Sequence, residues 1–129
     1  MDTTALRILI IDGYTKAARE QLQSGGASLA ADLYVKMLQR CAPTGVECDV
    51  IFPADSGVSL PVGETIQDYD GVAWTGCSSC VFSGEPDVAE QIEFARECYR
   101  RGVPAFGSCW AAQIAVVSAG GEVELNPNG

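Results

Sequence analysis

The 129-residue sequence contains no histidine, which removes the side chain that most often serves as a general base and a common zinc ligand. Basic residues are also scarce, because 8 lysines and arginines stand against 17 aspartates and glutamates, giving a net charge of −9. Such a chain has no basic face to neutralise nucleic-acid phosphates or anionic lipid. No apolar run approaches the roughly 20 residues of a membrane span, and no basic segment precedes the first apolar run. We therefore expect a cytoplasmic protein whose partners are small molecules or proteins, with neither nucleic acid nor membrane among them.

The length is that of one domain, and a hydrophobic content of 47% is enough for a core. Six cysteines could indicate a disulfide scaffold, but such scaffolds are poor in regular apolar segments. Here most cysteines lie in or beside such segments, so we expect reduced thiols that are mostly buried: Cys41, Cys48, Cys77, Cys80, Cys98 and Cys109.

Apolar runs and helical periodicity alternate along the chain. They predict strands at 7–12, 47–52, 71–75 and 103–107, one helix from residue 30 to a point near 41–45 and another at 87–102, while 13–26 is a polar stretch. This alternation is typical of βαβ units, so we predict a doubly wound, flavodoxin-like α/β fold with a mostly parallel sheet and helices on both faces. Because 7–12 and 103–107 are apolar on both faces, we expect both strands to be central.

The second predicted helix has a regular apolar spacing. We expect Val88, Ile92, Ala95 and Tyr99 to face inward, and Glu97 to pair with Arg101 on the outer side. Ligands of open α/β sheets bind outside the carboxyl ends of the strands. The loops after Asp12, Thr75 and Gly107 are therefore where chemistry is expected.

Cys109 lies at a predicted strand-to-helix turn, in the stretch FGSCWAAQ. A nucleophile on such a turn needs small neighbours, which Gly107, Ser108 and Ala111 supply. The positive end of a helix at 110–119, capped by the glycines at 120–121, would favour the thiolate form of Cys109. The backbone N–H of Trp110 would then provide half of an oxyanion hole. The alternative is a structural cysteine at a helix start.

A second glycine-containing loop at 74–87 is a candidate for the other half of the hole, since Gly76 leaves the backbone free to turn an N–H inward. Cys77 and Cys80 form a Cys-x-x-Cys pair, which could also indicate zinc or redox chemistry. A zinc site would lack a second pair of ligands. A thioredoxin-type pair opens a helix, whereas this helix is expected to begin later, near Pro86.

With these features in place, the chain resembles a class I glutamine amidotransferase domain of the GMP-synthetase-like branch, over nearly its whole length. The family's elbow, G-x-C-x-G-x-Q, corresponds here to Gly107, Cys109 and Gln113, with Ala111 in place of the second glycine. In the family's oxyanion loop, Gly76 is followed by Cys77 where a second small residue is usual. We expect a slightly tighter elbow, and a Cys77 N–H that can still donate.

The resemblance implies that Cys109 attacks the side-chain amide of glutamine and that the N–H groups of Cys77 and Trp110 hold the oxyanion. Ammonia is released and a γ-glutamyl thioester is hydrolysed. Gly76 and Gln113 would contact the substrate, no cofactor or metal is implied, and a synthase domain or subunit could accept the ammonia.

The family's downstream His-x-Glu pair has no counterpart in residues 1–129. We therefore expect these residues to be the N-terminal part of a single amidotransferase-like domain that is inactive alone. The remaining candidate bases are carboxylates such as Asp12 or Glu85, which are weakly basic near neutral pH. Two alternatives stay open: a non-catalytic α/β binding or regulatory module, and a γ-glutamyl hydrolase-type cysteine enzyme.

Overall fold

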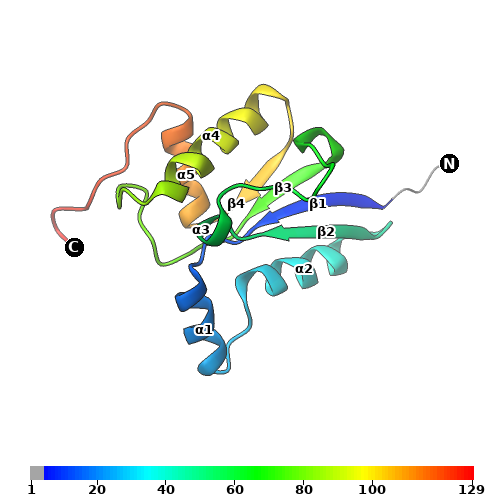
Figure 1. The fold of residues 1–129 in the computed structure, drawn as a ribbon, viewed down its shortest axis with the longest axis horizontal. Coiled ribbons are helices and arrows are strands. Elements are labelled where there is room, and N and C mark those ends of the chain that lie inside the picture. Colours follow the sequence, from blue (N-terminus) through cyan, green and yellow to red (C-terminus); the bar gives the residue numbers. More distant parts are fainter. Residues whose placement is uncertain (1–4) are drawn as a thin grey trace.

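The computed structural model describes residues 5–129 as one sheet with helices packed against it (Figure 1). All neighbouring strands are parallel, in the order β2-β1-β3-β4. Within these residues, no helix is both long and apolar enough to cross a membrane. The strands are β1 (Leu6–Ile11), β2 (Val46–Ile51), β3 (Gly71–Trp74) and β4 (Ala105–Gly107), and the helices are α1 (Lys16–Ser24), α2 (Ala30–Cys41), α3 (Pro53–Ser56), α4 (Pro86–Arg100) and α5 (Trp110–Ser118), with a 3₁₀ turn at Ile66–Asp68.

The sheet separates two apolar cores, because successive side chains of β1 point to opposite faces. Leu9 and Ile11 belong to the larger core, which includes buried residues of α4 and α5. Ile10 belongs to the smaller core, which is closed by Ala31 and its neighbours on α2. Figure 1 shows α4 and α5 on one side of the sheet and α2 on the other. The predicted flavodoxin-like α/β fold, with helices on both faces and β1 in a central position, is thus confirmed.

The prediction that 103–107 is a central strand is wrong. The strand is shorter, Ala105–Gly107, and lies at the edge of the sheet beside β3, with Phe106 60% exposed. Apolar grooves border β4 on both faces of the sheet, one against α4 and α5 and one against α2. An apolar run indicates that a strand suits apolar surroundings on both faces, but it does not specify which strand lies beside it.

The inward face of α4 agrees with the prediction at Val88, Ile92 and Ala95, which lie in or against the larger core, and differs at its last position. Val88 is buried as expected, but Tyr99 is 89% exposed and Cys98 occupies the inward position. The inward face also includes Gln91, which is fully buried and hydrogen-bonded inside the larger core. Counting apolar residues alone could not place a polar side chain at this position.

Helix α1 lies in the polar stretch 13–26, for which the sequence predicted no helix. The Thr15 hydroxyl caps its start by accepting a hydrogen bond from the Ala18 N–H, at 3.2 Å. Its buried residue is Arg19, which pairs with Asp55 and lies 4.2 Å over the Phe52 ring. A helix whose anchor is an arginine has no apolar stripe to reveal it.

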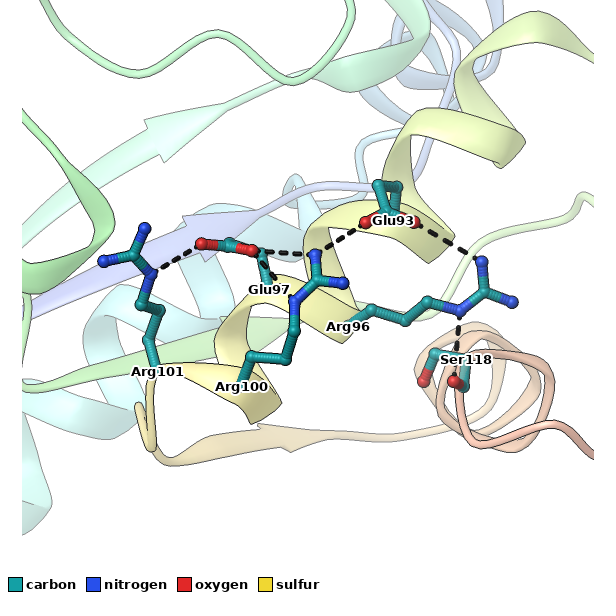
Figure 2. A network of polar contacts seen from close by, with 6 residues as sticks. All are labelled: Glu93, Arg96, Glu97, Arg100, Arg101 and Ser118. Atoms are coloured by element: carbon teal, nitrogen blue, oxygen red, sulfur yellow. Dashed lines mark hydrogen bonds and ion pairs between the residues drawn. The ribbon is translucent and has the colours of Figure 1, made fainter.

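A chain of ion pairs covers the outer face of α4 and links it to α5 (Figure 2). The predicted pair is present, with Arg101 Nε 2.6 Å from Glu97 Oε1, and the hydrogen bond from Arg101, followed by that from Arg100, lowers the pKa of Glu97. Arg96 Nε donates to the Ser118 carbonyl, at 3.2 Å, at the carboxyl end of α5. Because these side chains are partly or fully exposed, the ion pairs contribute little to stability, and the contact between the two helices is the Arg96 hydrogen bond.

Candidate active site

Cys109 occupies the turn between β4 and α5. It has φ 56° and ψ −104°, and among residues 5–129 it is the one non-glycine residue with positive φ. Its carbonyl accepts a hydrogen bond from the Ala112 N–H, at 3.0 Å, which starts α5, and its side chain is exposed. Strained backbone of this kind concentrates at functional sites. The predicted place of Cys109, after a strand and before a helix, is confirmed, whereas its role as a nucleophile stays a prediction.

The turn is tight because its neighbours are small. A Cβ on Gly107 would lie 2.3 Å from the Ala111 Cβ and 2.9 Å from the Trp74 carbonyl oxygen. A Cβ on Gly76 would lie 3.3 Å from the Cys109 Cβ and 3.9 Å from its Sγ. The loop after β3 therefore faces the thiol through a glycine. Alanine at position 111 is accommodated because position 107 has no side chain.

Gly107→Ala is expected to lower the free energy of unfolding by about 1–3 kcal/mol, because the added methyl group overpacks the elbow against Ala111 and Trp74. Combining it with Ala111→Gly should recover part of the loss, since the contact with the Trp74 carbonyl remains. Urea denaturation measures both effects. Gly25→Ala is the matched control, because a Cβ there meets its nearest atom at an ordinary 3.5 Å. Equal stability of the Gly107 and Gly25 variants would contradict the steric argument.

The three loops named from the sequence meet at one edge of the sheet. The Thr75 hydroxyl accepts a hydrogen bond from the Gly13 N–H, at 3.0 Å, and donates one to the Gly76 carbonyl, at 2.9 Å. A Cβ on Gly13 would lie 2.8 Å from Trp110 Cδ1 and 3.3 Å from the Cys77 Cβ. Gly13 thus contacts the residues that flank the thiol on both of the other loops.

The two proposed oxyanion donors have no competing acceptors. In the described part of the chain, no hydrogen bond uses the backbone N–H of Cys77 or of Trp110. The N–H of Trp110 also belongs to the first turn of α5, where unpaired donors attract negative charge. Both N–H groups are therefore free of acceptors within the described residues, and their role as oxyanion donors stays a prediction.

The Cys-x-x-Cys pair lies in a loop, as expected, and α4 begins only at Pro86. The Cys77 Sγ accepts a weak hydrogen bond from the Ser79 N–H, at 3.4 Å, and burial raises the pKa of the Cys77 thiol. A raised pKa disfavours the thiolate that redox or metal chemistry requires. The described residues also contain no group of three or more histidine, cysteine, aspartate or glutamate side chains that could hold a metal ion.

Gln113 lies on the first turns of α5 and reaches the loop before α4. Its Oε1 accepts a hydrogen bond from the Val81 N–H, at 3.1 Å. The carbonyl end of this side chain is thus used to hold the loop, which leaves the amide NH₂ for a substrate. Its contact with substrate stays a prediction.

Of the two carboxylates predicted as candidate bases, one is buried and the other is exposed. Asp12 is fully buried, and its two oxygens accept hydrogen bonds from the Tyr14 N–H, at 3.0 Å, and the Ala31 N–H, at 3.1 Å. It therefore fixes the start of α2, as a negative charge at a helix N-terminus does. Glu85 is exposed and precedes the first residue of α4.

Sequence reasoning missed Gln91, the buried amide of α4. Its Oε1 accepts hydrogen bonds from the indole N–H groups of Trp110, at 3.0 Å, and Trp74, at 3.1 Å. Its Nε2 donates to the Asp87 carboxylate, at 3.0 Å. A lone glutamine in a helix gives no local signal of such a role.

Comparison with known proteins finds a relative among the characterised hydrolases. The chain is 38% identical over 120 residues to the gamma-glutamyl-L-1-hydroxyisopropylamide hydrolase of a Pseudomonas species. The alignment covers 92% of this chain and 39% of the relative, so the chain spans about two-fifths of the relative's length. No protein-family model matches the chain. No solved structure matches it either.

Proposed function

We propose that the chain carries the nucleophile of a cysteine hydrolase that cleaves the amide of γ-glutamyl compounds, with glutamine as substrate and ammonia as product. The observation that carries this proposal is the conformation of Cys109. Its thiol is exposed, its backbone has a φ of 56°, and Gly76 lies next to its side chain. The next residue, Trp110, has a backbone N–H without an acceptor. The relative supports the bond type, since its name describes a γ-glutamyl amide hydrolase.

In the proposed reaction, the Cys109 thiolate attacks the side-chain carbonyl carbon of glutamine and forms a carbon–sulfur bond. The carbonyl oxygen becomes an oxyanion, which the N–H groups of Cys77 and Trp110 stabilise. The carbon–nitrogen bond then breaks and the nitrogen leaves as ammonia after gaining a proton. Water hydrolyses the γ-glutamyl thioester to glutamate and regenerates the thiol.

The substrate would lie over Gly76, where the missing side chain leaves room beside the thiol. The free amide NH₂ of Gln113 would donate a hydrogen bond to it. Because the Gln113 carbonyl holds the Val81 N–H, substrate binding and the shape of the 76–85 loop would be coupled. The ammonia would pass to a synthase domain or subunit.

We further propose that residues 1–129 form the N-terminal part of a larger domain in which additional polypeptide pairs with β4. Two observations support this proposal: β4 is an uncovered edge with apolar grooves on both faces, and the relative is more than twice as long as the aligned region. An uncovered, apolar strand edge is a template for pairing with another strand.

A glutamine-shaped chloroketone tests the proposed nucleophile. It should form a covalent adduct with Cys109. The rate of labelling should saturate as the reagent concentration rises, and free glutamine should lower this rate. Cys109→Ser should abolish the adduct, while Cys80→Ser, in the neighbouring loop, should leave it intact. Intact-protein and peptide mass spectrometry measure the labelling. Absence of any adduct would favour a binding module, and an adduct on Cys77 or Cys80 would favour a redox loop.

A second competition experiment shows whether the leaving group is an alkylamine or ammonia. It compares how well a γ-glutamyl alkylamide and glutamine protect Cys109 from the chloroketone. Protection by a γ-glutamyl alkylamide that is much stronger than protection by glutamine would favour a γ-glutamyl hydrolase-type enzyme, the function in the relative's name. Equal or stronger protection by glutamine would favour the ammonia-releasing reaction.

A further inference from the structure

One buried oxygen ties the residue after Cys109 to the centre of the larger core. Gln91 is fully buried, and its Oε1 accepts the indole N–H groups of Trp110 and Trp74, which come from α5 and β3. The amide end is fixed in turn by Asp87, one turn earlier on α4. Among residues 5–129, no buried side-chain nitrogen or oxygen lacks a partner, so this network is fully satisfied.

Trp110 is held from two directions. Its side chain is fully buried, with Gln91 at its indole nitrogen and Gly13 so close that a Cβ there would lie 2.8 Å from Cδ1. The preceding residue, Cys109, has the left-handed φ of 56°, which costs free energy and persists only where the surroundings fix the backbone. Trp110 is the neighbour through which the core can impose that conformation.

We infer that Gln91 is a positioning residue for Cys109: its side-chain carbonyl holds the Trp110 indole and thereby fixes the first turn of α5 behind the thiol. This inference rests on the proposed role of Cys109 as the nucleophile. The first turn carries the unpaired N–H groups that favour the thiolate and would receive the oxyanion. A shift of about 1 Å in such a turn can cost about 100-fold in rate.

The two tryptophans provide a matched pair of variants. Trp110→Phe and Trp74→Phe each remove one hydrogen bond to the same oxygen, but Trp110 is bonded to Cys109 and Trp74 lies in the strand. The readout is the iodoacetamide rate of Cys109 divided by that of Cys41, an exposed thiol at the far end of α2. Cys98, which is buried, reports unfolding in the same sample.

The ratio is expected to fall from about ten towards one in Trp110→Phe, because the thiolate loses the support of the first turn. It should stay at the wild-type value in Trp74→Phe, and Cys98 should stay protected in both. Equal ratios in the two variants, with Cys98 protected, would overturn the inference, because a merely structural role of Gln91 predicts no difference between them.

Gln91→Met tests the inference from the other partner, since it keeps the side-chain length and removes the shared acceptor. This variant is needed if Trp110→Phe unfolds the protein and exposes Cys98. The expected ratio of the Cys109 rate to the Cys41 rate is again near one. The double variant Gln91→Glu, Asp87→Asn keeps an acceptor for both indole N–H groups. It also keeps a hydrogen bond between positions 87 and 91, with the asparagine now the donor. Its ratio should therefore equal the wild-type value. Because the readout is thiol reactivity, it is independent of whether glutamine proves to be the substrate.

Discussion

Brief exposure to iodoacetamide at neutral pH is expected to alkylate Cys109 about tenfold faster than Cys41, and Cys98 far more slowly than either. Cys109 and Cys41 are both exposed, but they lie at opposite ends of helices, since Cys109 precedes α5 and Cys41 is the last residue of α2. The helix dipole favours a thiolate at the first position and opposes it at the second, by at most about 1.4 kcal/mol each. The two thiolate populations can thus differ by up to about 100-fold, and the weaker nucleophilicity of the better stabilised thiolate reduces this to about tenfold in rate.

Cys98 sets the lower end of the scale. Burial raises the pKa of the Cys98 thiol to about 12, against an ordinary value of 9.0. Its thiolate population at neutral pH is therefore about a thousandfold below that of an ordinary thiol, before steric protection is considered.

Peptide mapping after a timed quench measures the order of all six thiols, and Cys109→Ala and Cys41→Ala confirm the peptide assignments. Equal rates at Cys109 and Cys41 would remove the helix-end argument for an activated thiol. Fastest labelling at Cys77 or Cys80 would instead shift the chemistry to the loop before α4.

The elbow could be predicted from the sequence because its determinants are contiguous. Gly107, Cys109 and Ala111 lie within five residues, and the small side chains that the turn requires are themselves the signal. The parallel sheet could be predicted for a similar reason, because its strands and the helices α2 and α4 each have an apolar pattern of their own, whereas α1, which is anchored by Arg19, was missed.

The support of the elbow could not be predicted, because its contacts are distant in sequence and carry no pattern. Gln91 meets its tryptophan partners 17 and 19 residues away, and it interrupts an apolar stripe, so counting apolar residues placed Tyr99 inward instead of Cys98. The position of β4 at the sheet edge was missed because strand composition reports burial on two faces and says nothing about lateral neighbours.

Hydrolysis of glutamine by the 129 residues alone is expected to be about 100- to 10,000-fold slower than by the same chain extended through a His-x-Glu segment. Thiolate attack requires only the thiol and its donors, but expelling ammonia requires a proton donor, and hydrolysing the thioester requires a base that activates water. The sequence has no histidine, the Asp12 carboxylate is committed to the start of α2, and Glu85 is an exposed carboxylate. General acid–base help is typically worth about 100- to 10,000-fold, or roughly 3 to 5 kcal/mol of barrier.

External imidazole provides the missing base for a direct test on the 129-residue chain. Ammonia release from glutamine should rise with imidazole concentration, because free imidazole can reach an exposed thioester at Cys109 and deprotonate the attacking water. Cys109→Ser should show no such rise, which separates enzyme turnover from slow chemical hydrolysis. The extended chain should need no imidazole, since a base on a strand paired with β4 would already lie near the carboxyl end of the sheet. Turnover by the short chain that equals that of the extended chain and does not respond to imidazole would show that residues 1–129 already contain the base, with Asp12 and Glu85 as the candidates.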